Sequence, residues 1–184
     1  LMNGWVGKIL RVNLSEKKHV IEDLSEDLAR DYLGGRGLAT KILYDEIDPK
    51  IDPFDPDSKL ILASGCLTGT GAIAACRSVV VSKSPLGNIG CANVGGNFGS
   101  ELKYAGYDLI IFEGKAGEPT YLVIEDEKIE YLAAEALWGK DCYETDDILR
   151  RKIGDAWKAK EYSIACIGPA GEDLSSIASV IVDK

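Results

Sequence analysis

The sequence contains a single histidine, His19, and no two cysteines separated by two residues. One histidine cannot form a His-based metal site, and no G-x-S-x-G motif is present, which excludes the common Ser and Cys hydrolase triads. The five cysteines are an odd number without a CxxC pair, which argues against a disulfide framework and against a zinc or iron-sulfur site. We expect reduced, mostly buried thiols and an ordinary surface role for His19.

Long apolar runs are also missing, because no stretch approaches the roughly 20 residues that a membrane-spanning helix needs. The beginning of the chain lacks the charged segment, apolar run and cleavage site of a secretory signal. The net charge of −9 repels the phosphates of nucleic acids and anionic lipids. We therefore expect a soluble, cytoplasmic protein with no nucleic-acid partner and no membrane partner.

The 184 residues, 46% of them hydrophobic, are enough for one domain with a substantial core. β-Branched runs joined by a polar turn predict a hairpin at the start, and Ser25 is placed to cap a helix that Gly34 and Gly35 terminate. The predicted elements that complete this first half are a helix at 38–47, a strand at 60–63, a glycine-rich loop and a strand at 78–82.

The same order of elements returns in the last third of the chain. Its members are a hairpin at 120–132, a helix at 145–153, a strand at 163–167, a turn at 168–171 and a strand at 180–184. We interpret this as a duplication with halves at about 5–83 and 119–184, related by an approximate two-fold axis and joined by a glycine-rich segment at 84–118. The fold class is then α+β, with two mixed β-sheets and short helices. Chance agreement between common elements is the alternative.

The joining segment has a different character. It predicts a strand at 88–92, a helix that Gly95 and Gly96 open and that runs to Tyr104, and a buried strand at 108–112. A strand, a Gly-Gly pair and a helix N-terminus form a potential anion cradle, because free N–H groups and the helix dipole face the ligand.

Nine of the 20 glycines lie between Gly65 and Gly106. Tight turns between strands would explain this richness, but Arg77 stands between the glycine loop and an apolar strand, where a guanidinium needs an anionic partner. The stretch from Gly95 to Gly99 matches neither the dinucleotide-binding nor the P-loop pattern. Arg77 therefore favours a phosphate-like ligand of another kind.

Six motifs together resemble the N-terminal domain of the tungsten-containing aldehyde:ferredoxin oxidoreductase family. They are WVGKILRVNLS near the start, YLGGRGLA at 32–39, LTGT at 67–70, SKSPL at 82–86, ANVGGNFGSELKYAGYD at 92–108 and IGPAGE at 167–172. They cover essentially the whole chain in the order of the family.

The resemblance implies a base of two β-sheets beneath a tungsten (sometimes molybdenum) bis-pterin cofactor. It implies that Arg77 contacts the pterin, and that Asn93, Gly95 and Gly96 reach the pterin phosphates and a bridging magnesium ion, with Asn93 as a magnesium ligand. We assign Lys83, which follows on the same stretch, to this site. Backbone donors, a cation and hard oxygen ligands suit a phosphate pair.

The resemblance also implies an enzyme that oxidises aldehydes to carboxylic acids and passes electrons through a four-iron four-sulfur cluster to ferredoxin. The catalytic acids and cluster cysteines would lie beyond residue 184, so we expect a part of a longer chain that is inactive alone and holds no catalytic residue. Two alternatives remain: a reductase of the same family acting on a carboxylate or an aryl-CoA, and a non-catalytic binding or assembly module. The substrate, the choice of metal and homodimer formation are left open.

Overall fold

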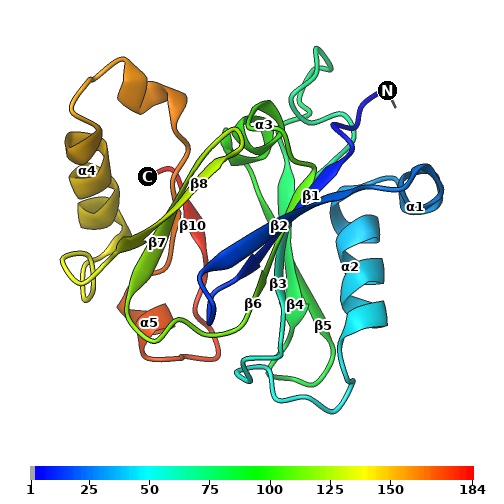
Figure 1. Cartoon of the computed structure of the whole chain (residues 1–184), viewed down its shortest axis with the longest axis horizontal. Helices are drawn as coiled ribbons and strands as arrows, with labels where there is room; N and C mark the ends of the chain where they lie inside the picture. Colours follow the sequence, from blue (N-terminus) through cyan, green and yellow to red (C-terminus); the bar gives the residue numbers. More distant parts are fainter. Residues whose placement is uncertain (1–2) are drawn as a thin grey trace.

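The computed structural model describes residues 3–184, which are built around a six-stranded mixed β-sheet (Figure 1). Its strands lie in the order β2-β1-β6-β3-β4-β5. They are β1 (Lys8–Asn13), β2 (Lys18–Asp23), β3 (Leu60–Ser64), β4 (Ser78–Lys83), β5 (Ile89–Val94) and β6 (Leu109–Glu113). Only β1 and β6 run parallel, and the other neighbouring pairs are antiparallel.

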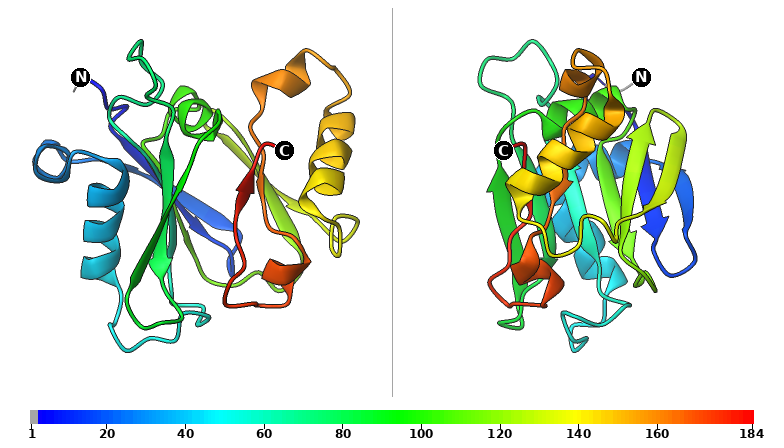
Figure 2. Two further views of the ribbon diagram at one scale, coloured as in Figure 1. Left: turned by 180° about the vertical axis from the view of Figure 1, so that it is seen from behind. Right: turned by 90° about the vertical axis from the view of Figure 1, so that its left-hand side faces the viewer.

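Both faces of this sheet are covered, so its central strands β3 and β6 consist mainly of consecutive apolar residues. Helices α1 (Glu26–Tyr32) and α2 (Gly35–Glu46) cover one face. Helix α3 (Phe98–Tyr104) and a hairpin of β7 (Thr120–Glu125) and β8 (Lys128–Ala133) cover the other (Figure 2). Alternation along the strands divides the core into two clusters, with Ile9, Ile61 and Ile111 in the first and Leu10, Val12 and Ile110 in the second.

Helix α1 begins as predicted, because the Ser25 side chain accepts a hydrogen bond from the Leu28 N–H at 3.2 Å. The helix ends before Gly34 and Gly35, also as predicted. Helix α2 starts at Gly35, several residues earlier than the apolar pattern at 38–47 indicated. The chain turns sharply here: Gly35 has a φ of +48°, and a Cβ on Gly37 would lie 2.4 Å from the Tyr32 carbonyl oxygen.

The last part of the chain forms small elements. They are α4 (Cys142–Ile153), a 3-10 helix (Lys158–Glu161), β9 (Ala165–Cys166), α5 (Pro169–Glu172) and β10 (Ile181–Val182). Helix α4 starts before the predicted residue 145 because the Asp141 side chain caps it, accepting from the Glu144 N–H at 2.8 Å. The strands predicted at 163–167 and 180–184 shorten to two residues each, and the turn predicted at 168–171 is a short helix.

The α+β class with sheets and short helices is confirmed, whereas the internal duplication is not. The order of hairpin, helix and two strands recurs, but the pairing of the strands differs between the halves. The β1–β2 hairpin joins the large sheet through β6, while β7–β8 and β9–β10 remain separate two-stranded ladders. The duplication and its boundaries stay a prediction.

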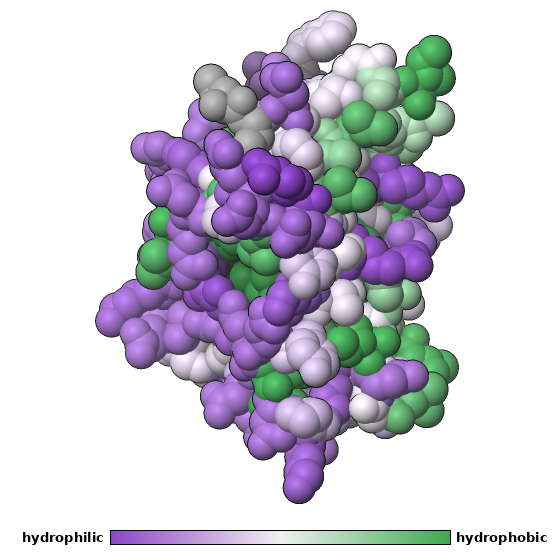
Figure 3. All heavy atoms as spheres, turned by 90° about the vertical axis from the view of Figure 1, so that its right-hand side faces the viewer, coloured by the Kyte–Doolittle hydropathy of each residue, from purple (hydrophilic) through white to green (hydrophobic). Residues whose placement is uncertain are grey.

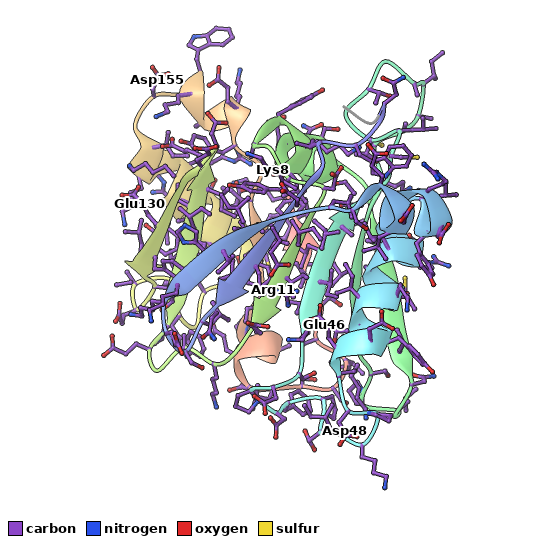
Figure 4. All side chains as sticks on the ribbon, turned by 45° about the vertical axis from the view of Figure 1, so that its right-hand side comes forward. Lys8, Arg11, Glu46, Asp48, Glu130 and Asp155 are labelled. Atoms are coloured by element: carbon purple, nitrogen blue, oxygen red, sulfur yellow. The ribbon has the colours of Figure 1, made fainter. Side chains whose placement is uncertain are left out.

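An ion-pair network joins β1, β2, β6 and α2 across one edge of the sheet. The Arg11 guanidinium donates to Glu22 at 2.9 Å and to Glu46 at 2.8 Å, and Glu113 lies 3.4 Å away. Lys59 pairs with Glu113 at 2.6 Å. Figure 4 shows Arg11 directed toward Glu46. The hydrogen bonds that Arg11 donates to Glu46 and Glu22, opposed by burial, raise the pKa of Arg11.

Candidate cofactor-binding surface

The candidate site lies where β4 begins and β5 ends. In the β4–β5 ladder Ser78 pairs with Val94 and Val79 pairs with Asn93. Extending this antiparallel register by one residue places Arg77 opposite Gly95. Arg77 and Gly95 are therefore neighbours across a strand pair, although they lie well apart in the sequence. The sequence analysis assigned both to one site.

Arg77 is held by its backbone while its side chain is exposed. Its carbonyl oxygen accepts a hydrogen bond from the hydroxyl of buried Thr68 at 2.9 Å, and the Thr68 N–H donates to the Gly65 carbonyl at 3.1 Å. These bonds fix both ends of the glycine-rich loop. None of the ion pairs formed within residues 3–184 involves Arg77, so its guanidinium is available to an anion.

Asn93, Gly95 and Gly96 form the facing part of the site. Asn93 is exposed, and a Cβ built on Gly95 would meet no atom within 4 Å, so the backbone here is open to close approach. Gly96 has a φ of +87°, which favours glycine. The two glycines do not open the helix directly as predicted, because α3 begins at Phe98 after Asn97, whose side chain makes no capping bond.

Asp183 is a residue of this surface that sequence reasoning missed. Its Oδ2 lies 3.8 Å from the position of a Cβ on Gly96, and its carboxylate is held by the Ser163 hydroxyl, the Ile164 N–H and Arg150. No local pattern marks this aspartate. The only sequence signal that pointed to this segment was the repeated order of elements in the two halves. That order aligned residues 180–184, which include Asp183, with β4.

The carboxylate of Asp183 adds negative charge beside the open glycines. Glu101 of α3 lies close enough to be affected by this charge. Burial, followed by the negative charges of Asp183 and Glu161, raises the pKa of Glu101. Arg150 offsets part of the charge of Asp183, because its guanidinium lies 3.2 Å from Asp183 Oδ1.

Lys83 is not brought to this surface. It is at the far end of β4 from Arg77, it is nearly buried, and its ammonium donates to the Pro49 carbonyl oxygen. Six residue steps of extended strand lead from one to the other, about 20 Å at 3.3 Å per residue. The structure therefore separates Lys83 from the other four assigned residues.

A buried ion pair supports the glycine-rich loop from below. Lys103 of α3 donates to the carbonyl oxygens of Gly4 at 2.5 Å and Cys66 at 3.2 Å, and its Nζ lies 3.7 Å from Asp108 Oδ1. Asp108 also accepts from the N–H groups of Val6 and Gly7. Burial lowers the pKa of Lys103 despite its acidic partner. This pair joins α3 to the start of the glycine-rich loop.

Two open depressions of the surface lie away from these residues. One, of about 470 Å³, is lined by Tyr32, Arg36, Gly37, Thr40, Lys41 and Tyr44. The other, of about 500 Å³, adjoins the Arg11 network and is lined in part by Glu46, Lys59 and Glu113. Hydrophilic residues predominate on the face that carries α1 and α2, and hydrophobic residues gather along one edge of it (Figure 3).

Within residues 3–184, no group of three or more His, Cys, Asp or Glu side chains is arranged to hold a metal ion. An ion at the candidate surface would therefore need ligands of other kinds, such as an amide, a backbone carbonyl or the phosphate oxygens themselves.

Within the same described residues, no helix has the length and apolarity needed to cross a membrane.

Residues 9–184 match the family described as "Aldehyde ferredoxin oxidoreductase, N-terminal domain". The tungsten-containing aldehyde ferredoxin oxidoreductase of Pyrococcus horikoshii is 50% identical over 181 residues, 98% of this chain and 29% of that protein. Its namesake from Pyrococcus furiosus is 48% identical over 183 residues, 99% of this chain and 30% of that protein.

The solved active-site complex BamBC of benzoyl coenzyme A reductase superposes with a TM-score of 0.94 at 36% identity, covering 99% of this chain and 27% of that one. The chain thus spans less than a third of the length of the relatives it matches. Both kinds of comparison agree with the motifs, and the chain belongs to the aldehyde ferredoxin oxidoreductase family as an N-terminal domain of that type.

Proposed function

We propose that this chain is the base on which a tungsten or molybdenum bis-pterin cofactor rests. Arg77, Asn93, Gly95 and Gly96 would hold the pterin phosphates, with Asn93 as a ligand of a bridging magnesium ion. The observation that carries the proposal is the β4–β5 register, which sets Arg77, without an ion-pair partner in residues 3–184, opposite an open glycine at one edge of the sheet.

Each residue contributes a different interaction. The Arg77 guanidinium presents a planar fork of N–H donors that suits phosphate oxygens. The open backbone at Gly95 and Gly96 lets N–H groups approach the same oxygens without a side chain between them. Asp183, whose carboxylate is paired with Arg150, borders the surface beside Gly96.

We further propose that the whole enzyme oxidises aldehydes to carboxylic acids. The metal of the bound cofactor supplies the two-electron redox chemistry, and this domain supplies orientation and charge. Electrons would leave through a four-iron four-sulfur cluster, held by residues outside this chain, to ferredoxin in the cytoplasm. Residues 1–184 would act as one cofactor-base domain that is inactive without the remainder, and homodimer formation is compatible with this arrangement.

A reductase acting on another substrate is the second candidate. The likeness to the benzoyl coenzyme A reductase complex, at 36% identity and a TM-score of 0.94, is consistent with it. Identities of 48–50% to the aldehyde enzymes favour aldehyde oxidation. A non-catalytic assembly module would bind no pterin, which the next experiment distinguishes.

The test is Arg77→Ala in the enzyme that contains this domain, with tungsten, molybdenum and pterin measured in the purified protein. One charge-assisted contact contributes roughly 1.5–3 kcal/mol, so cofactor affinity should fall about ten- to a hundredfold. The matched control is Arg30→Ala, an exposed arginine of α1 that lies 4.0 Å from Asp27. Unchanged pterin content in the Arg77 variant contradicts the proposal, and activity toward aldehydes against aryl-CoA compounds separates the two reactions.

A further inference from the structure

The first turn of α4 lies against the segment that leaves β9. A Cβ on Gly168 would be 3.5 Å from the Cys142 sulfur, and the Gly139 N–H donates to the Glu172 carboxylate at 2.8 Å. Cys142 is the first residue of α4, and Cys166 is the last residue of β9, two positions before Gly168. The helix start and the strand end are thus held together at two neighbouring points.

The two thiols lie at this junction. Both are free and half-buried, and the Cys142 sulfur is 3.5 Å from the position of a Cβ two residues after Cys166. Burial, then the Cys142 thiol and the charge of Asp146, raise the pKa of Cys166 to about 12. Cys166 therefore keeps its proton at neutral pH and reacts slowly with oxidants.

The surrounding elements have little apolar packing of their own. The buried residues of α4 are Thr145 and Asp146, and one oxygen of Asp146 has no hydrogen-bond partner within residues 3–184. Neither hydrophobic cluster of the described residues includes a residue of α4, β9 or β10. Polar contacts hold this part together, so a covalent bond between α4 and β9 would change its rigidity more than it would in a well-packed core.

We propose that Cys142 and Cys166 are a redox-convertible pair that closes a disulfide between α4 and β9. A two-electron oxidant, such as an azodicarboxamide or a small disulfide, accepts two electrons and two protons. The two S–H bonds break, one S–S bond forms, and the oxidant leaves as a hydrazine or as two thiols. The bond would fix the start of α4 on the β9–β10 ladder, and a small dithiol would reverse it.

The remaining cysteines are in different surroundings. Cys76 and Cys91 are exposed, and the carbonyl oxygen of Cys66 accepts a hydrogen bond from Lys103. Cys91 pairs with Val81 in the β4–β5 ladder, so its strand neighbour is not a cysteine. Intramolecular oxidation should therefore be selective for the α4–β9 pair, although the exposed thiols react faster with alkylating reagents.

The experiment treats the 184-residue protein with diamide, alkylates the remaining thiols in acid-quenched samples and maps the peptides by mass spectrometry. We expect the free thiols to fall from five to three, with one disulfide-linked peptide pair joining Cys142 to Cys166. The midpoint of thermal unfolding should rise on oxidation and return with dithiothreitol. Because Cys166 resists deprotonation, the rate should increase from neutral to mildly alkaline pH.

Two variants complete the test. Cys142→Ser should abolish the loss of two thiols and the thermal shift, while Cys76→Ser, at an exposed position, should retain both, with four free thiols falling to two. Retention of all five thiols in the unaltered protein overturns the proposal. So does a disulfide that joins any other cysteines, or a two-thiol loss that persists in Cys142→Ser.

Discussion

Replacing Lys103 by Met removes one member of the buried pair beneath the glycine-rich loop while keeping most of the side chain's apolar length. The lysine side chain is 7% exposed and that of its partner Asp108 is 2% exposed. The ammonium's bonds to the Gly4 and Cys66 carbonyls would be lost, and the Asp108 carboxylate would remain buried. The structure therefore predicts a clear loss of stability.

The size of the loss follows from what remains in place. Breaking a buried ion pair by removing one partner costs about 3–5 kcal/mol. Asp108 keeps two donors, the N–H groups of Val6 and Gly7, so part of its charge stays compensated. We therefore expect the lower end of that range, about 3 kcal/mol in the free energy of unfolding.

Urea unfolding followed by circular dichroism measures this change, with Lys41→Met as the matched control. Lys41 pairs with Asp45 on the exposed side of α2, so its replacement should have little effect. Exposed ion pairs contribute less than about 1 kcal/mol to the free energy of unfolding. A decrease of that size or smaller for Lys103→Met would refute the reasoning.

The same variant has a pH signature. Burial lowers the pKa of Lys103 below its ordinary value of 10.5, so the native protein releases this proton at lower pH than the unfolded chain does. The unfolded state then binds more protons, and stability rises with pH up to about 10.5. This alkaline gain should be missing in Lys103→Met. An equal pH dependence in both proteins would show that Lys103 is not buried as described.

Glu46→Gln should flatten the decline of stability in acid. Burial alone would raise the pKa of Glu46, but hydrogen bonds donated by Arg11 hold this pKa below 4.5. The ionised carboxylate therefore stabilises the fold fully above pH 4.5, and this stabilisation is lost as the pH falls through the folded pKa. Thermal unfolding between about pH 7 and pH 3 measures this, and an unchanged acid slope would contradict it. Ser25→Ala should lower the free energy of unfolding by about 1 kcal/mol through loss of the α1 cap, measured in urea. No change would mean that α1 does not depend on its cap.

Elements whose signal is local were predictable from the sequence. Ser25 caps α1 through a residue three positions away, and the β7–β8 hairpin follows from two β-branched runs and a two-residue turn. The apolar run at 108–112 correctly indicated a strand buried on both faces, now β6. In each case the residues that decide the structure lie within a few positions of one another.

Features that depend on distant partners were not predictable in the same way. Lys83 follows an apolar strand, as a ligand-binding lysine would, but its partner is the Pro49 carbonyl in a distant loop. The approach of Asp183 to Gly96 depends on how the end of the chain folds back. The neighbourhood of Arg77 and Gly95 was expected from family resemblance, and the strand register supplies its geometry.

The position of β6 between β1 and β3 also determines when this sheet can form during synthesis. Until residue 113 has left the ribosome, the strands can form only two separate antiparallel pieces, β1–β2 and β3–β4–β5, with no hydrogen bonds between them. Each exposes an unpaired apolar edge, which is a site for mispairing with other chains. The arrival of Leu109–Glu113 joins both edges at once, so the nascent domain passes abruptly from two aggregation-prone fragments to one continuous six-stranded sheet.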